Sequence, residues 1–267
     1  MKIKKIKISN FGNIQNQTIN IDQNIILLES KDELLTLLKW LMNIEMIDSL
    51  NAMNSLLSER STINIDFIDT KNNLVRYSEC KGDKVFNRNF TIGNFTTSNF
   101  LTDAFSEHFF PQEYSDYTFL DLERGYKNDY IAQYINRLKK WVRESFSNRP
   151  PHDRSSEEVI NFTKKYVETF KKVEIGKGLY FLINKNNNFV LQDSNDKTVR
   201  LNKTNRALFT ILCFIYTNHF FSLLKEYDEE MESAYTPLLI KGNIFEKEKD
   251  IILNLLKEQK RQVFILS

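Results

Sequence analysis

The first 44 residues limit the possible folds more than any other part of the sequence. Residues 5–8 and 19–22 alternate apolar with polar side chains on either side of a turn-forming segment, Asn10 to Asn13, which predicts a half-buried β-hairpin. The apolar run 25–28 lacks alternation, as is typical of a short strand covered on both faces. Leucines at helical spacing then predict an amphipathic helix over 34–44. Phosphate-binding loops are usually built on this order of strand, turn and helix.

This opening resembles the amino-terminal lobe of ATP-binding-cassette heads of the SMC, RecF and Rad50 ATPases. That family has a basic strand, an Asn-Phe-Gly turn and a second strand, followed by a G-x-N-G-x-G-K-[ST]-T loop and a helix containing Leu-Leu. Aligning Thr36-Leu37-Leu38 with the start of that helix puts Leu34 at the position of the phosphate-binding lysine and Leu35 at that of the magnesium-binding hydroxyl. The degenerate nucleotide-loop positions are then Ser30, Lys31, Asp32, Glu33, Leu34 and Leu35.

The local chemistry also disfavours a nucleotide at this helix. No glycine occurs between Gly12 and Gly82, so backbone amides cannot easily adopt the left-handed turns that surround a phosphate. Ser30 and Glu33 predict a capping box, with Asp32 in the same first turn. The helix would then supply anions to its own positive end, and we expect no nucleotide cofactor.

The second half of the chain follows the family's order of elements while its diagnostic residues differ. The segment 201–207 lies where the family has its L-S-x-G-E/Q signature, but Asn202, Thr204 and Asn205 replace Ser, Gly and Glu. Residues 236–240 resemble the Walker B strand, although Lys241 and Gly242 stand in place of its acidic pair. A helix over 246–258 and a strand over 262–266 follow in the family's order.

The resemblance implies an α/β fold: a two-lobed ABC-ATPase-like head with a mixed sheet and flanking helices. Residues 1–92 would form its amino-terminal lobe, with strands in 63–67, 73–80 and 84–92, and residues 176–267 its carboxy-terminal lobe. Residues 93–175 would be a helical insertion, in which two amphipathic helices, 127–147 and 156–173, replace the family's long coiled coil with a short hairpin.

The function implied by the resemblance is that of a non-catalytic subunit. Phosphoryl transfer requires a lysine and Mg²⁺ to neutralise developing charge. The lysine and the residues that would bind Mg²⁺ are both missing at the positions that the resemblance gives. We therefore expect a pseudo-ATPase with an accessory or structural role in a bacterial SMC-like DNA-maintenance or anti-phage defence complex. Its partner would be an SMC-like ATPase or a second copy, and DNA would be contacted directly or through the complex. The interface candidates are Glu29, Asp32 and Glu33 on one side and Lys203 and Arg206 on the other.

Two alternatives remain open. A free-standing nucleic-acid-binding module would use the basic residues Lys5, Lys7, Lys139, Lys140 and Arg143. A metal-dependent nuclease would use the acidic residues Asp121, Glu123 and Asp129. Three well-separated histidines and the absence of C-x-x-C or H-E-x-x-H spacing give no conventional metal site, so we expect none.

Composition agrees with a cytoplasmic protein. The hydrophobic fraction is 41% and the charged fraction 27%, and the net charge of +2 gives no argument for nucleic acid by itself. Two cysteines imply no disulfide framework. Residues 207–224 lack Asp, Glu, Lys and Arg, but we expect a buried helix there and no membrane span.

Overall fold

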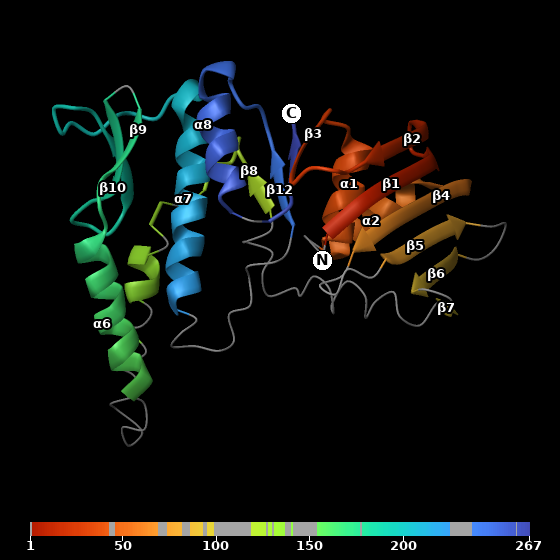
Figure 1. Ribbon diagram of the computed structural model, residues 1–267, viewed down its shortest axis with the longest axis horizontal. Helices are drawn as coiled ribbons and strands as arrows, with labels where there is room; N and C mark the ends of the chain where they lie inside the picture. The colour runs from red at the N-terminus through yellow and green to blue at the C-terminus, as the bar shows by residue number, and fades with distance from the viewer. Residues whose placement is uncertain are drawn as a thin grey trace. The chain divides into compact units, whose positions relative to one another are not determined.

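The computed structural model contains helices and sheets in a mixed α/β arrangement, as predicted (Figure 1). It describes residues 2–42, 46–68, 74–81, 86–92, 95–98, 119–126, 128–129, 131–136, 140, 154–176, 178–224, 237–259 and 261–267. The chain forms two compact units. Unit 1 comprises Met1–Leu120, Ala234–Asn243 and Leu255–Ser267, and unit 2 comprises Asp121–Ser233 and Ile244–Asn254.

Unit 1 contains a six-stranded antiparallel sheet in the order β2-β1-β4-β5-β6-β7. Its strands are β1 (Lys2–Phe11), β2 (Ile14–Asn20), β4 (Leu57–Ile68), β5 (Leu74–Lys81), β6 (Phe86–Ile92) and β7 (Phe95–Ser98). The predicted hairpin is confirmed, with Ile6 opposite Ile19, and the further strands predicted between 63 and 92 are confirmed as well. Along β1, Ile6 and Ile8 are buried, so this face of the sheet belongs to the core.

A second sheet in unit 1 joins strands from both ends of the sequence. Its order is β3 (Ile25–Leu28), β13 (Val263–Leu266), β12 (Leu238–Lys241) and β8 (Phe119–Asp121). β13 pairs in parallel with both β3 and β12, so the strands predicted near 236–240 and 262–266 are confirmed. The predicted burial of β3 on both faces is wrong: Leu27 is 52% exposed, whereas Ile26, on the opposite face, is only 9% exposed.

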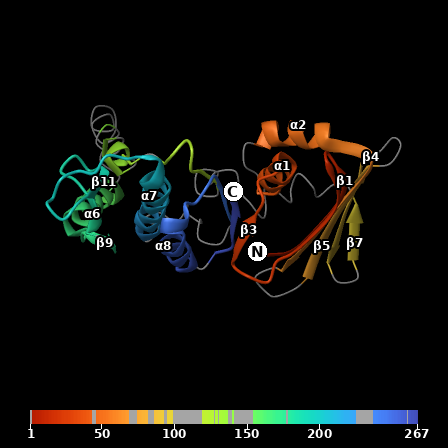
Figure 2. The same ribbon diagram turned by 90° about the horizontal axis from the view of Figure 1, so that it is seen from above.

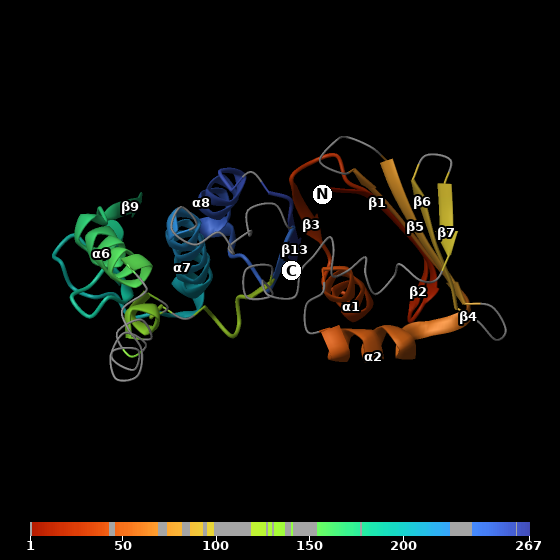
Figure 3. The same cartoon turned by 90° about the horizontal axis from the view of Figure 1, so that it is seen from below.

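Helices α1 (Asp32–Leu41) and α2 (Met46–Leu56) complete unit 1. The predicted helix is confirmed, although it ends at Leu41 and not at residue 44. Figures 2 and 3 show α1 between β3 and the antiparallel sheet. Its buried leucines share one core with Ile6, Ile65 and Phe264, and this core connects both sheets.

The side chain of Gln262 fixes the beginning of β13 to β1. Its Nε2 donates a hydrogen bond to the carbonyl of Ile3 at 2.7 Å, and its Oε1 accepts one from the Ile3 amide at 2.8 Å. Both groups are buried, so this one side chain satisfies two backbone groups that would otherwise lack partners.

Unit 2 packs helices against a three-stranded antiparallel sheet in the order β11-β10-β9. Its elements are α6 (Arg154–Thr169), β9 (Val173–Gly176), β10 (Leu179–Ile183), β11 (Phe189–Gln192), α7 (Lys203–Leu224) and most of α8 (Glu246–Lys257). Aromatic rings fill its core: the Phe181 ring stacks on that of Phe189, with centroids 4.9 Å apart, and on that of Tyr216 at 5.3 Å.

The two helices predicted in the middle of the chain have different outcomes. The helix predicted over 156–173 exists as α6, but it runs from Arg154 to Thr169, and Val173 belongs to β9. Of the helix predicted over 127–147, residues 131–136 are helical, and much of the remainder lies outside the described residues. α7 is largely buried, and none of the helices in the described ranges is long and apolar enough to cross a membrane.

Candidate functional site at the first helix

The turn between β1 and β2 lies against the beginning of α1. Asn10 and Gly12 have φ angles of 52° and 54°, in the left-handed region that favours glycine. A Cβ atom at Gly12 would lie 2.6 Å from Cγ of Glu33 and 2.9 Å from Cδ2 of Leu56, so glycine is required by conformation and by space. The Gly12 amide donates to the carbonyl of Leu56 at 2.9 Å, which holds the turn against α2.

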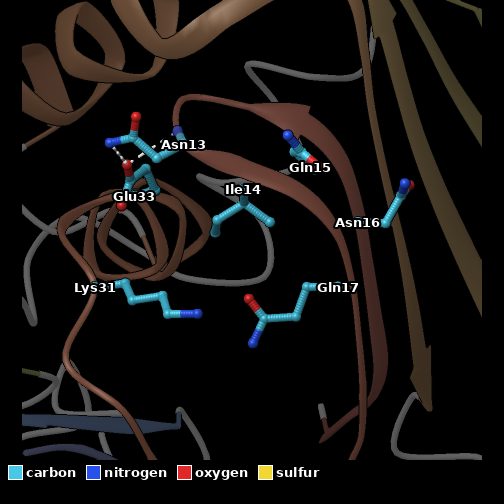
Figure 4. A pocket seen from close by; sticks show the side chains of 7 residues that line it. All are labelled: Asn13, Ile14, Gln15, Asn16, Gln17, Lys31 and Glu33. Atoms are coloured by element: carbon cyan, nitrogen blue, oxygen red, sulfur yellow. Dashed lines mark hydrogen bonds between the residues drawn. The ribbon is translucent and has the colours of Figure 1, made fainter.

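Glu33 links α1 to this turn. Its Oε1 accepts hydrogen bonds from the amide of Asn13 at 3.1 Å and from Nδ2 of Asn13 at 2.7 Å (Figure 4). The predicted capping box is wrong, because the N-cap is Lys31, without a side-chain cap, and the Ser30 amide donates to the carbonyl of Ser267. The carboxylate therefore connects two elements of the fold and does not cap its own helix through Ser30.

The hydrogen bonds to Glu33 stabilise its charged form. Its pKa lies below the ordinary value because its own backbone amide, the Asn13 amide and the Asn13 side chain all donate to the carboxylate, with a further contribution from the charge of Lys31. Burial acts in the opposite direction and does not reverse this shift. Glu33 is 8% exposed and remains an anion at neutral pH.

A pocket of about 680 Å³ opens beside this link. It is lined by Asn13, Ile14, Gln15, Asn16, Gln17, Lys31 and Glu33. Figure 4 shows the side chains of Lys31 and Gln17 extending toward one another below Ile14. Oε1 of Gln17 is buried and has no hydrogen-bond partner among the described residues. The sequence did not lead us to predict Asn13, Gln15, Asn16 and Gln17 as pocket residues. Four carboxamide side chains close together after a turn could have indicated a polar site.

The chemistry of this pocket is that of hydrogen bonding. Leu34 is 1% exposed and Leu35 is half-buried, and both pack on the core at the positions where the resemblance places the lysine and the hydroxyl. Carboxamides donate and accept hydrogen bonds but neither carry charge nor transfer protons readily at neutral pH. The surroundings of Glu33 keep it ionised and bound, so it is a poor general acid.

The segments that the sequence resemblance compares with Walker B and the signature also form regular structure. Lys241 ends β12 and is half-buried, with Leu266 opposite it on β13. Asn202 and Asn205 cap α7 reciprocally: each backbone amide donates to the other side chain's Oδ1, at 2.7 and 3.0 Å. These residues supply neither the carboxylates nor the glycine of a nucleotide-dependent ATPase head.

The interface candidates differ in exposure. The side chain of Glu29 is 88% exposed and lies 3.9 Å from the ammonium of Lys31. Asp32 is exposed, whereas Glu33 is buried and hydrogen-bonded within unit 1. In unit 2, Lys203 and Arg206 are exposed on the first turn of α7.

The nucleic-acid candidates on β1 lie within the sheet. Lys7 is exposed and Lys5 half-buried, and β1 is flanked by β2 and β4, so these lysines are not on a sheet edge. Lys5 lies opposite Asp66, a cross-strand arrangement of opposite charges. Lys140 is exposed, while Lys139 and Arg143 lie outside the described residues.

The acidic residues considered for a nuclease serve local hydrogen bonds. Oδ1 of Asp121 accepts from the amides of Glu123 and Arg124, and Oδ2 of Asp129 accepts from Nε2 of Gln133. Glu123 is exposed. Among the residues with described positions, no group of three or more His, Cys, Asp or Glu side chains is arranged to hold a metal ion.

No family model and no curated protein matches the sequence. Solved structures similar to the chain include two of one protein. One is the recombination mediator protein RecF with ATPrS, at 13% identity and a TM-score of 0.45, covering 99% of this chain and 92% of that one. The other is the same mediator with ATP, at 12% identity and a TM-score of 0.41, covering 99% and 93%.

Proposed function

We propose that this chain is a pseudo-ATPase: a non-catalytic accessory or structural subunit of an SMC-like bacterial DNA-maintenance or anti-phage defence assembly. The observation that carries the proposal is the link between Glu33 and Asn13 at the first helix. The Glu33 carboxylate is bound to Asn13, and Leu34 is packed in the core, at the positions that the sequence resemblance compares with a phosphate-binding loop and its lysine. An incoming triphosphate would meet fixed negative charge and would have to break two hydrogen bonds.

The magnitudes support this choice. Electrostatic stabilisation by one positioned group in an active site is worth several kcal/mol. By the resemblance, the lysine and the hydroxyl are replaced at Leu34 and Leu35, the acidic pair at Lys241 and Gly242, and the signature glycine at Thr204. Of the residues that line the described pocket, Lys31 alone is a cation, and the anionic Glu33 lies beside it. The combined loss therefore removes the lysine, the Mg²⁺ ligands and the signature glycine on which phosphoryl transfer depends.

Isothermal titration calorimetry with ATP and Mg²⁺ tests the proposal directly. We expect no binding stronger than a dissociation constant of about 100 µM, which corresponds to roughly 5.5 kcal/mol, and no release of phosphate. A tighter, magnesium-dependent isotherm would contradict the pseudo-ATPase proposal.

We also propose that residues 1–92 and 176–267 are two lobes of one head, with 93–175 inserted between them. The parallel sheet supports the proposal, because β13 lies between β3 and β12 and so combines both ends of the chain. A protease site engineered after Pro150 provides the test. The two fragments should remain associated without denaturant, and their separation on gel filtration would exclude a shared head.

The partner in this proposal is an SMC-like ATPase or a second copy of the chain. The exposed carboxylates of Glu29 and Asp32 on one protein would face Lys203 and Arg206 on the other. Because exposed pairs contribute only about 0.2 to 1 kcal/mol each, apolar contacts must supply most of the affinity. Assembly should therefore be independent of ATP and moderately sensitive to salt.

Charge reversal tests this interface. Glu29→Lys with Asp32→Lys should weaken assembly in analytical ultracentrifugation, while circular dichroism remains unchanged. Asp22→Lys with Glu59→Lys is the matched control, since both residues are exposed in unit 1 and the change in charge is the same. Equal effects of both variants would remove this surface from the proposal.

A further inference from the structure

A row of basic residues leads from the sheet of unit 2 into its buried helix. Lys197, Arg200, Lys203 and Arg206 follow at intervals of three residues, and all four side chains are exposed. These four residues are called the basic tract below. No Asp or Glu occurs from Lys197 to Leu224. Figure 1 shows this part of the chain passing from the three-stranded sheet through a loop into the beginning of α7.

The acidic residues that precede the basic tract are already engaged within their loop. Oδ1 of Asp193 accepts hydrogen bonds from the amides of Asn195 and Lys197, at 2.9 and 3.0 Å. Oδ1 of Asp196 lies 2.7 Å from the ammonium of Lys172, which also lies 4.1 Å from the centroid of the Tyr180 ring. Lys172 therefore compensates the charge of Asp196. The carboxylate of Asp193 is held by backbone amides and leaves the four tract side chains without an acidic partner among the described residues.

The way in which α7 begins adds to this positive potential. Its reciprocal cap consists of two neutral carboxamides, Asn202 and Asn205, and its first turn contains no acidic residue. Nδ2 of Asn205 also donates to the carbonyl of Arg200 at 3.3 Å, which fixes the tract's backbone relative to the helix. The positive end of the helix dipole thus adds to the charges of Lys203 and Arg206.

Within the described part of the chain, none of the four tract side chains takes part in an ion pair. Six residue-to-residue steps separate Lys197 from Lys203, so their Cα atoms lie at most about 20 Å apart. A single α1 terminus of a second copy offers two exposed carboxylates, Glu29 and Asp32, with Lys31 between them. That is fewer anions than the tract has cations. A nucleic-acid duplex offers one phosphate per about 1.7 Å of its axis, which is enough for every cation.

We infer that the basic tract binds the phosphate backbone of a nucleic acid. Each cation displaces condensed counterions from the backbone, so binding should weaken steeply with salt and depend little on sequence. With four phosphate contacts on a duplex, the affinity should fall about 150-fold between 50 and 200 mM salt. Lys203 and Arg206 also belong to the proposed protein interface, so a nucleic acid and the partner protein would compete for these two residues. The inference does not depend on the absence of ATP binding, and Lys197 and Arg200 lie outside that interface, so a failure of either proposal is visible separately.

Fluorescence anisotropy with labelled single-stranded and duplex oligonucleotides tests the inference on the full chain. The test variant is Lys197→Gln with Arg200→Gln, which leaves the proposed protein interface intact. Losing two phosphate contacts should reduce the salt-induced loss of duplex affinity from about 150-fold to about 12-fold between 50 and 200 mM. The matched control is Lys164→Gln with Lys165→Gln, two exposed lysines of α6, and it should retain the wild-type salt dependence.

Several results would overturn the inference. One is a salt dependence of duplex binding that is unchanged in the Lys197→Gln, Arg200→Gln variant. Another is a reduction of the salt dependence in the α6 control that equals the reduction in the test variant. Absence of oligonucleotide binding by the wild-type chain at 50 mM salt would do the same. Poly-glutamate that binds as tightly as single-stranded DNA of equal charge would assign the surface to acidic polypeptides instead.

Discussion

Replacing Glu33 should cost more stability than its position in the first turn of a helix suggests. A hydrogen bond to a charged group contributes about 1.5 to 3 kcal/mol net. Glu33→Ala removes two such bonds, to the amide and the side chain of Asn13. Asn13 is exposed, so in the variant its two donors can bind water, and the lower value of about 1.5 kcal/mol applies to each bond. We therefore expect the free energy of unfolding to fall by about 3 kcal/mol. Glu33→Gln keeps the shape but not the charge, and about half of that loss is expected.

The pH dependence of this loss follows from the lowered pKa of Glu33. A carboxyl group whose folded pKa lies below its unfolded value, about 4.5, stabilises the protein above that pH. This contribution disappears as the pH falls through the folded pKa. The difference in unfolding free energy between wild type and Glu33→Gln should therefore be largest at neutral pH and should shrink below about pH 4.5.

Urea unfolding followed by circular dichroism at several pH values measures both effects. Glu29→Gln is the matched control, because Glu29 is highly exposed and its loss should stay within about 0.5 kcal/mol. If Glu33→Gln destabilised the protein by the same amount at pH 4 and pH 7, the charge of Glu33 would not hold the turn. If Glu33→Ala cost less than about 0.5 kcal/mol, the link itself would be unimportant.

Two further predictions concern backbone positions that depend on a single partner. Gly12→Ala should cost about 1 to 3 kcal/mol, because it adds a clash with Glu33 to an unfavourable φ. Gly178→Ala, at φ 66° with Cβ of Ser194 at an ordinary 3.7 Å from the new Cβ, has a similar φ without the clash and should cost less in the same thermal unfolding assay. Gln262→Ala should cost about 2 to 4 kcal/mol in urea unfolding, since it leaves the buried amide and carbonyl of Ile3 unpaired. A loss below about 1 kcal/mol would mean that water replaces the amide.

The sequence by itself determined the local elements of this protein. Strict alternation around Ile6 and Ile19 specified the first hairpin, because a half-buried strand must change faces at every residue. The spacing of leucines specified α1, since only a helix brings residues three and four apart onto one face. The absence of glycine between Gly12 and Gly82 and the presence of leucine at position 34 were also visible without a structure, because the sequence gives the identity of every residue.

Only the tertiary structure decided which groups meet across the chain. The sequence suggested that Glu33 would cap its own helix with Ser30, yet its carboxylate binds Asn13, 20 positions away. Hydrogen bonding between distant segments depends on how the turn is placed against α1, and no local pattern encodes that placement. The exposure of Leu27 has the same origin, because an apolar run indicates a strand but not whether neighbours cover both of its faces.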